Sequence, residues 1–361
     1  MRELWHAAGR SAGDPAKRRV ALIGILLSAP TLLVGALLSN LLAGAGVAGL
    51  TRPLAYIRAP LLRAYEADAD LAVLGYVTLQ ALLLACLWSF YATALQRLAA
   101  VDLTQGRREE TDAAYDFAAR HWRGVLGAKV ALAVGVGLPL AVALAFDHLA
   151  RLDGWMGGVG LALGIVVTTV LSFLAVFVLL GWLVGGLLST PVIACEDSGS
   201  FDALSRTFGY AGAGLVRLTL WRLAFLGGVL LGSAWRALRL LAVVGVAYAC
   251  LRAGAGAEAL DRVERILQSL GAPAGAERLQ VTWAEQLAAG VAAATLFLLV
   301  AGWLADAIAR LACARMGLFL ALRGAIDKLP RTHLASAPVV EPFRDAEAAG
   351  FEEAARVGQD G

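Results

Sequence analysis

The apolar residues of this chain come in uninterrupted blocks that are about as long as a membrane is thick. A helix needs about 20 apolar residues to cross a hydrocarbon core of about 30 Å. The blocks predict six membrane-spanning helices, at about residues 20–43, 71–95, 125–146, 159–188, 215–236 and 284–305. We therefore predict an all-α fold, a polytopic transmembrane helix bundle that forms a single domain over residues 1–329.

The composition agrees with a membrane environment. Hydrophobic residues make up 59% of the chain and charged residues 16%, whereas soluble domains have about 45–50% and about 25%. No dense basic stripe with interleaved aromatic residues occurs, so we expect membrane lipids and no nucleic acid among the partners. The histidines and cysteines are scattered along the chain, and we predict neither a metal site nor a cofactor; these residues are His6, His121, His148, His333, Cys86, Cys195, Cys250 and Cys313.

The basic residues indicate an orientation. Arginine and lysine are plentiful before the first predicted span, between the second and the third, and after the sixth. The loops on the other side contain fewer of them. Because basic loops stay in the cytoplasm, both termini are predicted to be cytoplasmic. The wealth of Arg, Ala and Gly is typical of a high-GC genome, and we expect a multi-pass protein of the bacterial inner membrane.

Two segments do not fit a simple series of spans. The apolar stretch at 240–251 is too short to cross a membrane. It is either a re-entrant or interfacial segment or a continuation of the fifth helix, and the sequence leaves both open. The segment 330–361 contains Pro, Gly and acidic residues without a sustained apolar face, which predicts a weakly ordered cytoplasmic tail.

An internal repeat is indicated by two short amphipathic segments, at 111–123 and 200–210. Each has a polar residue that can cap a helix and apolar residues that recur at helical spacing. The pair Asp112-Ala113 superposes on Asp202-Ala203 at a shift of 90 residues, as does Gly124 on Gly214. The pattern predicts a unit used twice, in which a helix in the cytoplasmic interface leads into a span.

The second of these segments carries a resemblance to known membrane proteins. The strings are TPVIACE at 190–196 and FDALSRTF at 201–208, with a closing helix at 313–323. Together they resemble a recurrent element of uncharacterised bacterial polytopic membrane proteins. They are more distantly similar to the membrane domain found with glycerophosphodiester phosphodiesterases, whose catalytic domain is absent here. The resemblance covers about 96–217 and 310–327, and it implies an architecture without an active site.

Small residues in the fourth predicted span indicate a packing seam. Four glycines fall within one arc of the helix, at Gly160, Gly164, Gly181 and Gly185. Because glycine lets two helix backbones approach closely, this arc predicts contact with a neighbouring helix. Gly228 and Gly232 could provide the matching groove within the chain, and a homo-oligomer or another membrane protein could provide it from outside.

Four arginines of the fifth helix are candidate contacts for a lipid headgroup or an anionic solute: Arg217, Arg222, Arg236 and Arg239. The alternative is ordinary anchoring. Arg217 and Arg236 are about 28 Å apart along a helix, which is about one bilayer thickness, so they could mark the two membrane surfaces.

The acidic residues predict local ion pairs. Glu196, Asp197 and Asp202 follow the fourth span, where Asp202 can pair with Arg206 one turn later. Asp306 and Arg310 are also one turn apart, near the end of the sixth span. As the deepest acid, Asp306 is the residue to test for proton coupling.

No catalytic constellation emerges, so we do not expect an enzyme. The first hypothesis is a non-enzymatic membrane scaffold or accessory subunit of a membrane assembly. The alternative is a permease or lipid-handling protein that binds an anionic headgroup or solute. A membrane-embedded hydrolase would need a nucleophile and a base, and we find no such pair.

Overall fold

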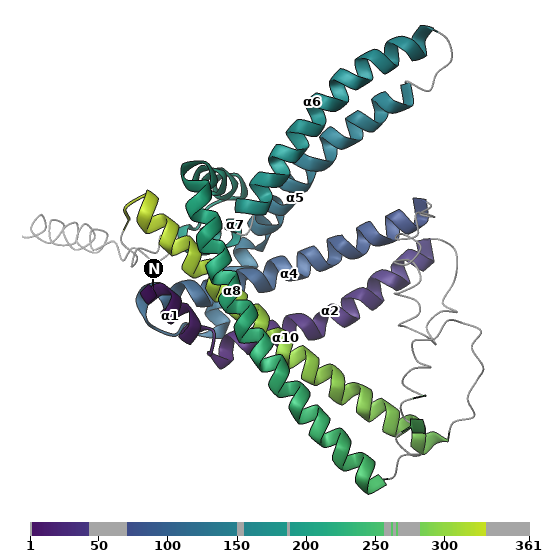
Figure 1. Cartoon of the computed structure of the whole chain (residues 1–361), viewed down its shortest axis with the longest axis vertical. Helices are drawn as coiled ribbons and strands as arrows, with labels where there is room; N and C mark the ends of the chain where they lie inside the picture. The colour runs from purple at the N-terminus through teal and green to yellow at the C-terminus, as the bar shows by residue number, and fades with distance from the viewer. Residues whose placement is uncertain are drawn as a thin grey trace, which may run out of the picture.

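The structure is a computed structural model, and it describes residues 2–42, 71–149, 155–185, 188–255, 261, 262, 265 and 282–329. Within these ranges the chain is helical and contains no strand. The elements (Figure 1) are α1 Arg2–Ser11, α2 Pro15–Leu42, α4 Leu71–Gln105, α5 Thr111–Leu149, α6 Trp155–Gly185, α7 Ser189–Glu196, α8 Ser200–Ala255 and α10 Trp283–Ile326. Six of these are long and apolar enough to cross a membrane: α2, α4, α5, α6, α8 and α10. The predicted all-α membrane fold is confirmed.

The six long helices form three hairpins, α2–α4, α5–α6 and α8–α10. The hairpins start from one compact region and then spread apart, as Figure 1 shows. We call this region the hub. It contains α1 and α7, together with the ends of α2, α4, α5, α8 and α10 that meet them.

The hub holds the buried core. Small side chains let the helices approach closely there, including Ala99, Ala100, Ala203 and Ala314. Larger side chains fill the space between them, among them Leu188, Ile193, Leu218, Met316 and Phe319. The short helix α7 is buried from Ser189 to Cys195. Pro191 lies in its first turn, where a backbone N–H has no partner within the helix, so the missing donor costs little. The motif at 190–196 thus builds the hub.

The fifth predicted span is part of a longer helix. A break at Gly214 (φ −166°, ψ 51°) separates the amphipathic segment from the rest of α8. Beyond it α8 continues to Ala255, so the stretch at 240–251 extends the helix and is not re-entrant. This outer half of α8 pairs with the first half of α10.

The other amphipathic segment behaves differently. Residues 111–123 are the opening turns of α5 and run into the span as one helix, without the break found at Gly214. The two segments therefore differ in geometry at Gly124 and Gly214, and the internal repeat remains a prediction from the sequence.

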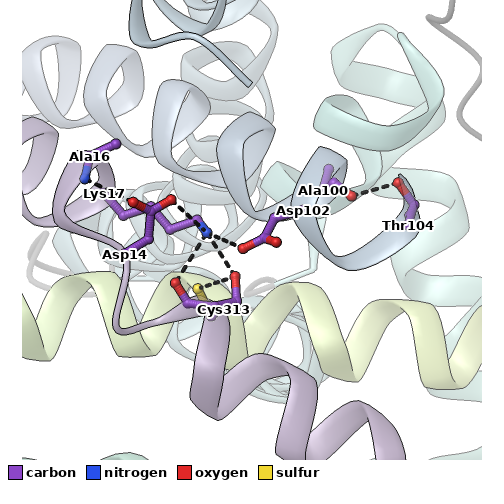
Figure 2. A network of polar contacts seen from close by, with 8 residues as sticks. Asp14, Ala16, Lys17, Ala100, Asp102, Thr104 and Cys313 are labelled. Carbon is purple, nitrogen blue, oxygen red and sulfur yellow. Dashed lines mark hydrogen bonds and ion pairs between the residues drawn. The ribbon is translucent and has the colours of Figure 1, made fainter. Parts of the chain in front are cut away.

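A buried lysine joins the first elements of the chain to the hub (Figure 2). The Lys17 side chain is 1% exposed, and its Nζ lies 2.6 Å from Oδ2 of Asp102 on α4. It also donates to Oγ of Ser11 at 2.7 Å and to the Ser11 carbonyl at 3.1 Å. Ser11 Oγ in turn lies 3.4 Å from Sγ of Cys313 on α10. One ammonium thus links α1, α2 and α4, and reaches α10 through Ser11.

We predict that Lys17→Met lowers the free energy of unfolding by about 3–5 kcal/mol, because it leaves Asp102 without its cation. Thermal unfolding in detergent, followed by circular dichroism, measures the change. The double variant Lys17→Met with Asp102→Leu should recover part of the loss, since it removes the carboxylate of Asp102 as well and leaves only that of Asp14, which lies 3.6 Å from the Lys17 ammonium in the wild type. Equal melting temperatures for the wild type and Lys17→Met would contradict the role of this ion pair.

A close contact between α1 and α8 gives a second prediction. A Cβ placed on Gly228 would overlap the indole ring of Trp5, whereas one on Gly227 would meet nothing within 4 Å. Gly228→Ala should therefore destabilise the protein by about 1–3 kcal/mol through overpacking. Gly227→Ala is the matched control, and it should melt at or above the wild-type temperature because alanine favours a helix. The same measurement checks both, and equal effects of the two changes would refute this docking of α1.

Candidate functional site

Three arginines from three helices surround one buried aspartate at the edge of the hub. The Asp306 side chain on α10 is 5% exposed. Arg310, one turn later, lies 2.8 Å from it, and Arg18 of α2 lies 2.9 Å from it. Arg236 of α8 forms the third ion pair. The predicted pair between Asp306 and Arg310 is confirmed, and the other two partners come from distant parts of the chain.

The local sequence explains how these side chains converge. Asp306 and Arg310 share one face of α10 because they are four residues apart. Arg18 lies two residues before Val20, where the apolar run of α2 begins. Gly232 on α8 leaves room for Arg310, since a Cβ there would lie 2.8 Å from Nη1 of that arginine. The glycine groove predicted at Gly228 and Gly232 is thus occupied by Trp5 and Arg310, and the idea that it receives α6 is wrong.

This arrangement carries a surplus of positive charge. One carboxylate neutralises one of the three guanidinium groups around it. Arg239 adds a further cation close to Arg236, and its guanidinium stacks over the Trp235 ring at 5.0 Å. Within the described part of the chain, Asp306 is the acid that faces Arg236. We call Arg18, Arg236, Arg239, Asp306 and Arg310 the Asp306 cluster.

The Asp306 cluster lines one end of a groove between α8 and α10. The groove has a volume of about 290 Å³ and is bounded by Arg236, Arg239 and Asp306 on the polar side, and by Leu240, Val243, Leu299, Gly302 and Trp303 on the apolar side. The Trp303 indole is held in place by donating to the Ser233 carbonyl at 3.0 Å. The neighbouring Val243 is 64% exposed, so the apolar end lies at the outer surface of the hairpin. Cations at one end and hydrocarbon at the other match an anionic amphiphile.

A second ionic network fastens α7 to α8 and α10. Glu196, at the end of α7, pairs with Arg206 at 2.5 Å and with Arg323 at 3.4 Å. Burial raises the pKa of the Glu196 carboxyl, while the two arginines act in the opposite direction. The predicted pair Asp202–Arg206 is present at 3.3 Å.

The rest of this network also ties helices together. Asp197 meets His121 of α5, and Tyr210 of α8 donates a hydrogen bond to Asp327 at the end of α10. These contacts fit the prediction of ion pairing rather than acid–base chemistry. Among the described residues, no three His, Cys, Asp or Glu side chains gather in a way that could hold a metal.

The four predicted arginines do not form one site. Arg236 and Arg239 belong to the Asp306 cluster, while Arg217 is exposed beside Trp221. Arg222 is half-buried and does not line the groove. Arg236 does not mark an end of the helix, since α8 continues beyond it to Ala255. Sequence reasoning missed Arg18, whose only signal was its place before an apolar run.

The glycine seam of α6 is partly described. α6 packs along α5, with Gly164 buried and Gly160 half-buried. On the facing helix, a Cβ at Gly135 would lie 3.3 Å from Val178. The burial of Gly181 and Gly185 lies outside the described residues. The packing seam itself stays a prediction from the sequence.

Comparison with known proteins adds no further guide. No family model matches the chain, and searches of curated proteins and of solved structures found no match either. The geometry of the groove and its charges is the basis for assigning a function.

We predict that Asp306→Asn lowers the free energy of unfolding by about 3–5 kcal/mol, because it leaves three arginines without a counter-charge. Thermal unfolding in neutral detergent measures this change. Asp112→Asn serves as the control, since that aspartate is exposed. A melting temperature for Asp306→Asn equal to that of the control would show that the arginines do not depend on Asp306.

Proposed function

We propose that this chain is a lipid-handling membrane protein that binds an anionic lipid headgroup at the Asp306 cluster. The single observation that supports this most is the surplus of arginine charge at the polar end of an apolar groove. An uncompensated cation at the edge of a membrane is costly unless an anion or water neutralises it. A phospholipid phosphate provides that anion, and its acyl chain belongs in the groove.

The roles of the residues follow from their positions. Arg236 and Arg239 line the groove and would bind the phosphate, for which the planar guanidinium provides paired donors. Leu240, Val243 and Leu299 would contact the acyl chain. Asp306 would position Arg236 and Arg310, and its carboxylate would offset one positive charge of the cluster. In this proposal the chain carries out no reaction of its own, and its action is binding.

The proposed location follows from the charge pattern. We place the protein in the inner membrane of a bacterium, with both termini and the hub on the cytoplasmic side. The Asp306 cluster would then lie at the level of the headgroups of the inner leaflet, where anionic lipids are attracted by basic side chains.

A scaffold or accessory subunit is the second candidate. It is favoured by the long apolar faces of the diverging hairpins, since only 6% of the apolar window of α8 is buried. Val216, Leu231 and Val246 are examples of side chains that are more than half exposed along this helix. A second copy of the chain or another membrane protein could cover such a face, as could lipid.

The test of lipid binding compares phosphatidylglycerol with phosphatidylcholine of the same acyl chains. We expect the delipidated full chain in neutral detergent to retain phosphatidylglycerol preferentially in native mass spectrometry. The double variant Arg236→Gln/Arg239→Gln should weaken that binding by about tenfold or more. A hydrogen bond to a charged group contributes about 1.5–3 kcal/mol, and about 1.4 kcal/mol corresponds to a tenfold change in affinity. Arg217→Gln, on the exposed face of the same helix, is the control and should bind as the wild type does.

The outcomes separate the two candidates. Equal binding of the two lipids, or an unchanged affinity in the double variant, would refute the lipid site. If the lipid preference is absent and a membrane protein co-purifies in stoichiometric amount, the scaffold function holds instead.

A further inference from the structure

We propose that a pocket between the end of α1 and the end of α4 binds a soluble organic phosphate, in which a phosphate group is joined to a hydroxylated body, as in a sugar phosphate. The pocket has a volume of about 580 Å³. Its polar side chains are Arg10, Ser11, Asp14, Asp102 and Arg108. We call it the α1–α4 pocket. It shares no residue with the Asp306 cluster, so the proposal does not rest on the function assigned there.

Two turns that end helices form the walls of the α1–α4 pocket. Gly106 follows α4 in the left-handed conformation (φ 66°), and its N–H donates to the Asp102 carbonyl at 3.1 Å. Glycine adopts this conformation without strain, and for this reason it commonly ends a helix. Gly13 follows α1, and its N–H donates to the Arg10 carbonyl at 2.9 Å. The chain turns at both places, and the two turns bring Arg10 and Arg108 to the same pocket.

The buried ion pair of the hub borders this pocket (Figure 2). Lys17 Nζ lies 2.6 Å from Oδ2 of Asp102 and 3.6 Å from Oδ2 of Asp14, and both aspartates line the pocket. The Asp102 side chain is 24% exposed, so part of its carboxylate can accept a hydrogen bond from a molecule in the pocket. Because the buried lysine holds both carboxylates in place, these acceptors are positioned before any ligand binds.

The two arginines of the pocket are exposed and are not engaged with other side chains. Within the described part of the chain, neither Arg10 nor Arg108 forms an ion pair or a side-chain hydrogen bond. Together with Lys17 they make three cations, against the two carboxylates of Asp14 and Asp102. The pocket therefore carries a surplus of one positive charge, and its guanidinium groups can donate to an anion.

The chemistry of the lining selects an anion that also carries hydrogen-bond donors. A guanidinium group binds the oxygens of a phosphate with paired N–H donors. The carboxylates of Asp14 and Asp102 accept hydrogen bonds, and they would repel a second anionic group. A phosphate at the arginines with hydroxyl groups at the aspartates satisfies both halves of the pocket, and a sugar phosphate has this arrangement.

The size and the apolar lining of the pocket favour a soluble ligand. The volume of about 580 Å³ lies within the range of small-molecule sites, which is about 300–1,000 Å³. A pocket of this size has room for an organic body beside the phosphate. Among the described residues that line it, the side chains of Ala7 and Leu103 are the apolar ones. They offer an acyl chain little surface, in contrast to the groove beside the Asp306 cluster.

The experiment uses the full chain in neutral detergent, with ribose phosphate, glucose phosphate, the two free sugars and inorganic phosphate as probes. Binding is measured by the concentration dependence of the shift in melting temperature, since a ligand that binds the folded state stabilises it. At least one sugar phosphate should bind more tightly than inorganic phosphate, and the free sugars should cause no shift. Arg10→Gln/Arg108→Gln should weaken the binding by about tenfold or more. Both side chains are exposed, so the ligand-free variant should melt as the wild type does.

Two control variants locate the binding. Arg107 is exposed on the same turn, its Nε donates to Gln105, and it does not line the pocket. Arg107→Gln should therefore bind the sugar phosphate as the wild type does. Arg236→Gln/Arg239→Gln should also leave this binding unchanged, so failure here is distinct from failure at the Asp306 cluster.

The remaining outcomes overturn the proposal. They are no stabilisation by either sugar phosphate, equally tight binding of inorganic phosphate, and an unchanged affinity in Arg10→Gln/Arg108→Gln. Phosphatidylglycerol is the last probe. If it binds through Arg10 and Arg108 while the sugar phosphates cause no shift, the two arginines contact lipid headgroups and the pocket has no soluble ligand of this class.

Discussion

The buried ion pair between Lys17 and Asp102 is the interaction on which the rest of the structure depends. An ammonium held at 1% exposure needs a carboxylate beside it, and the nearest one lies on α4, far along the chain. Because Lys17 pairs with Asp102, the chain turns sharply after α1 and α2 packs against α4. Because the hairpins separate beyond the hub, contacts at the hub set the direction of each hairpin (Figure 1). The same turn of the chain after α1 allows α1 to pack against α8 and α10.

The first turn of α2, which carries Lys17, also contributes Arg18 to the candidate site. Lys17 and Arg18 are neighbours, so their side chains point about 100° apart around α2. One reaches Asp102 on α4 and the other reaches Asp306 on α10. The placement of Arg18 is therefore a consequence of the placement of Lys17. A change that displaces Lys17 would therefore be expected to displace Arg18 from Asp306 as well.

The sequence predicted what depends on local spacing and missed what depends on distant contacts. Span length and the pairs Asp306–Arg310 and Asp202–Arg206 follow from periodicity within one helix. The convergence of Arg18 and Arg236 on Asp306 joins residues that are far apart in the chain, and spacing carries no signal for it. The stretch at 240–251 was ambiguous because the length rule treats each span separately, whereas α8 continues through it alongside α10.

The ion pairs within the Asp306 cluster bear on what the groove can hold. At the Asp306 cluster an internal carboxylate already offsets part of the charge, so the protein can keep its fold while the groove is empty or occupied. Under the proposed function, a ligand that exchanges readily suits such a site.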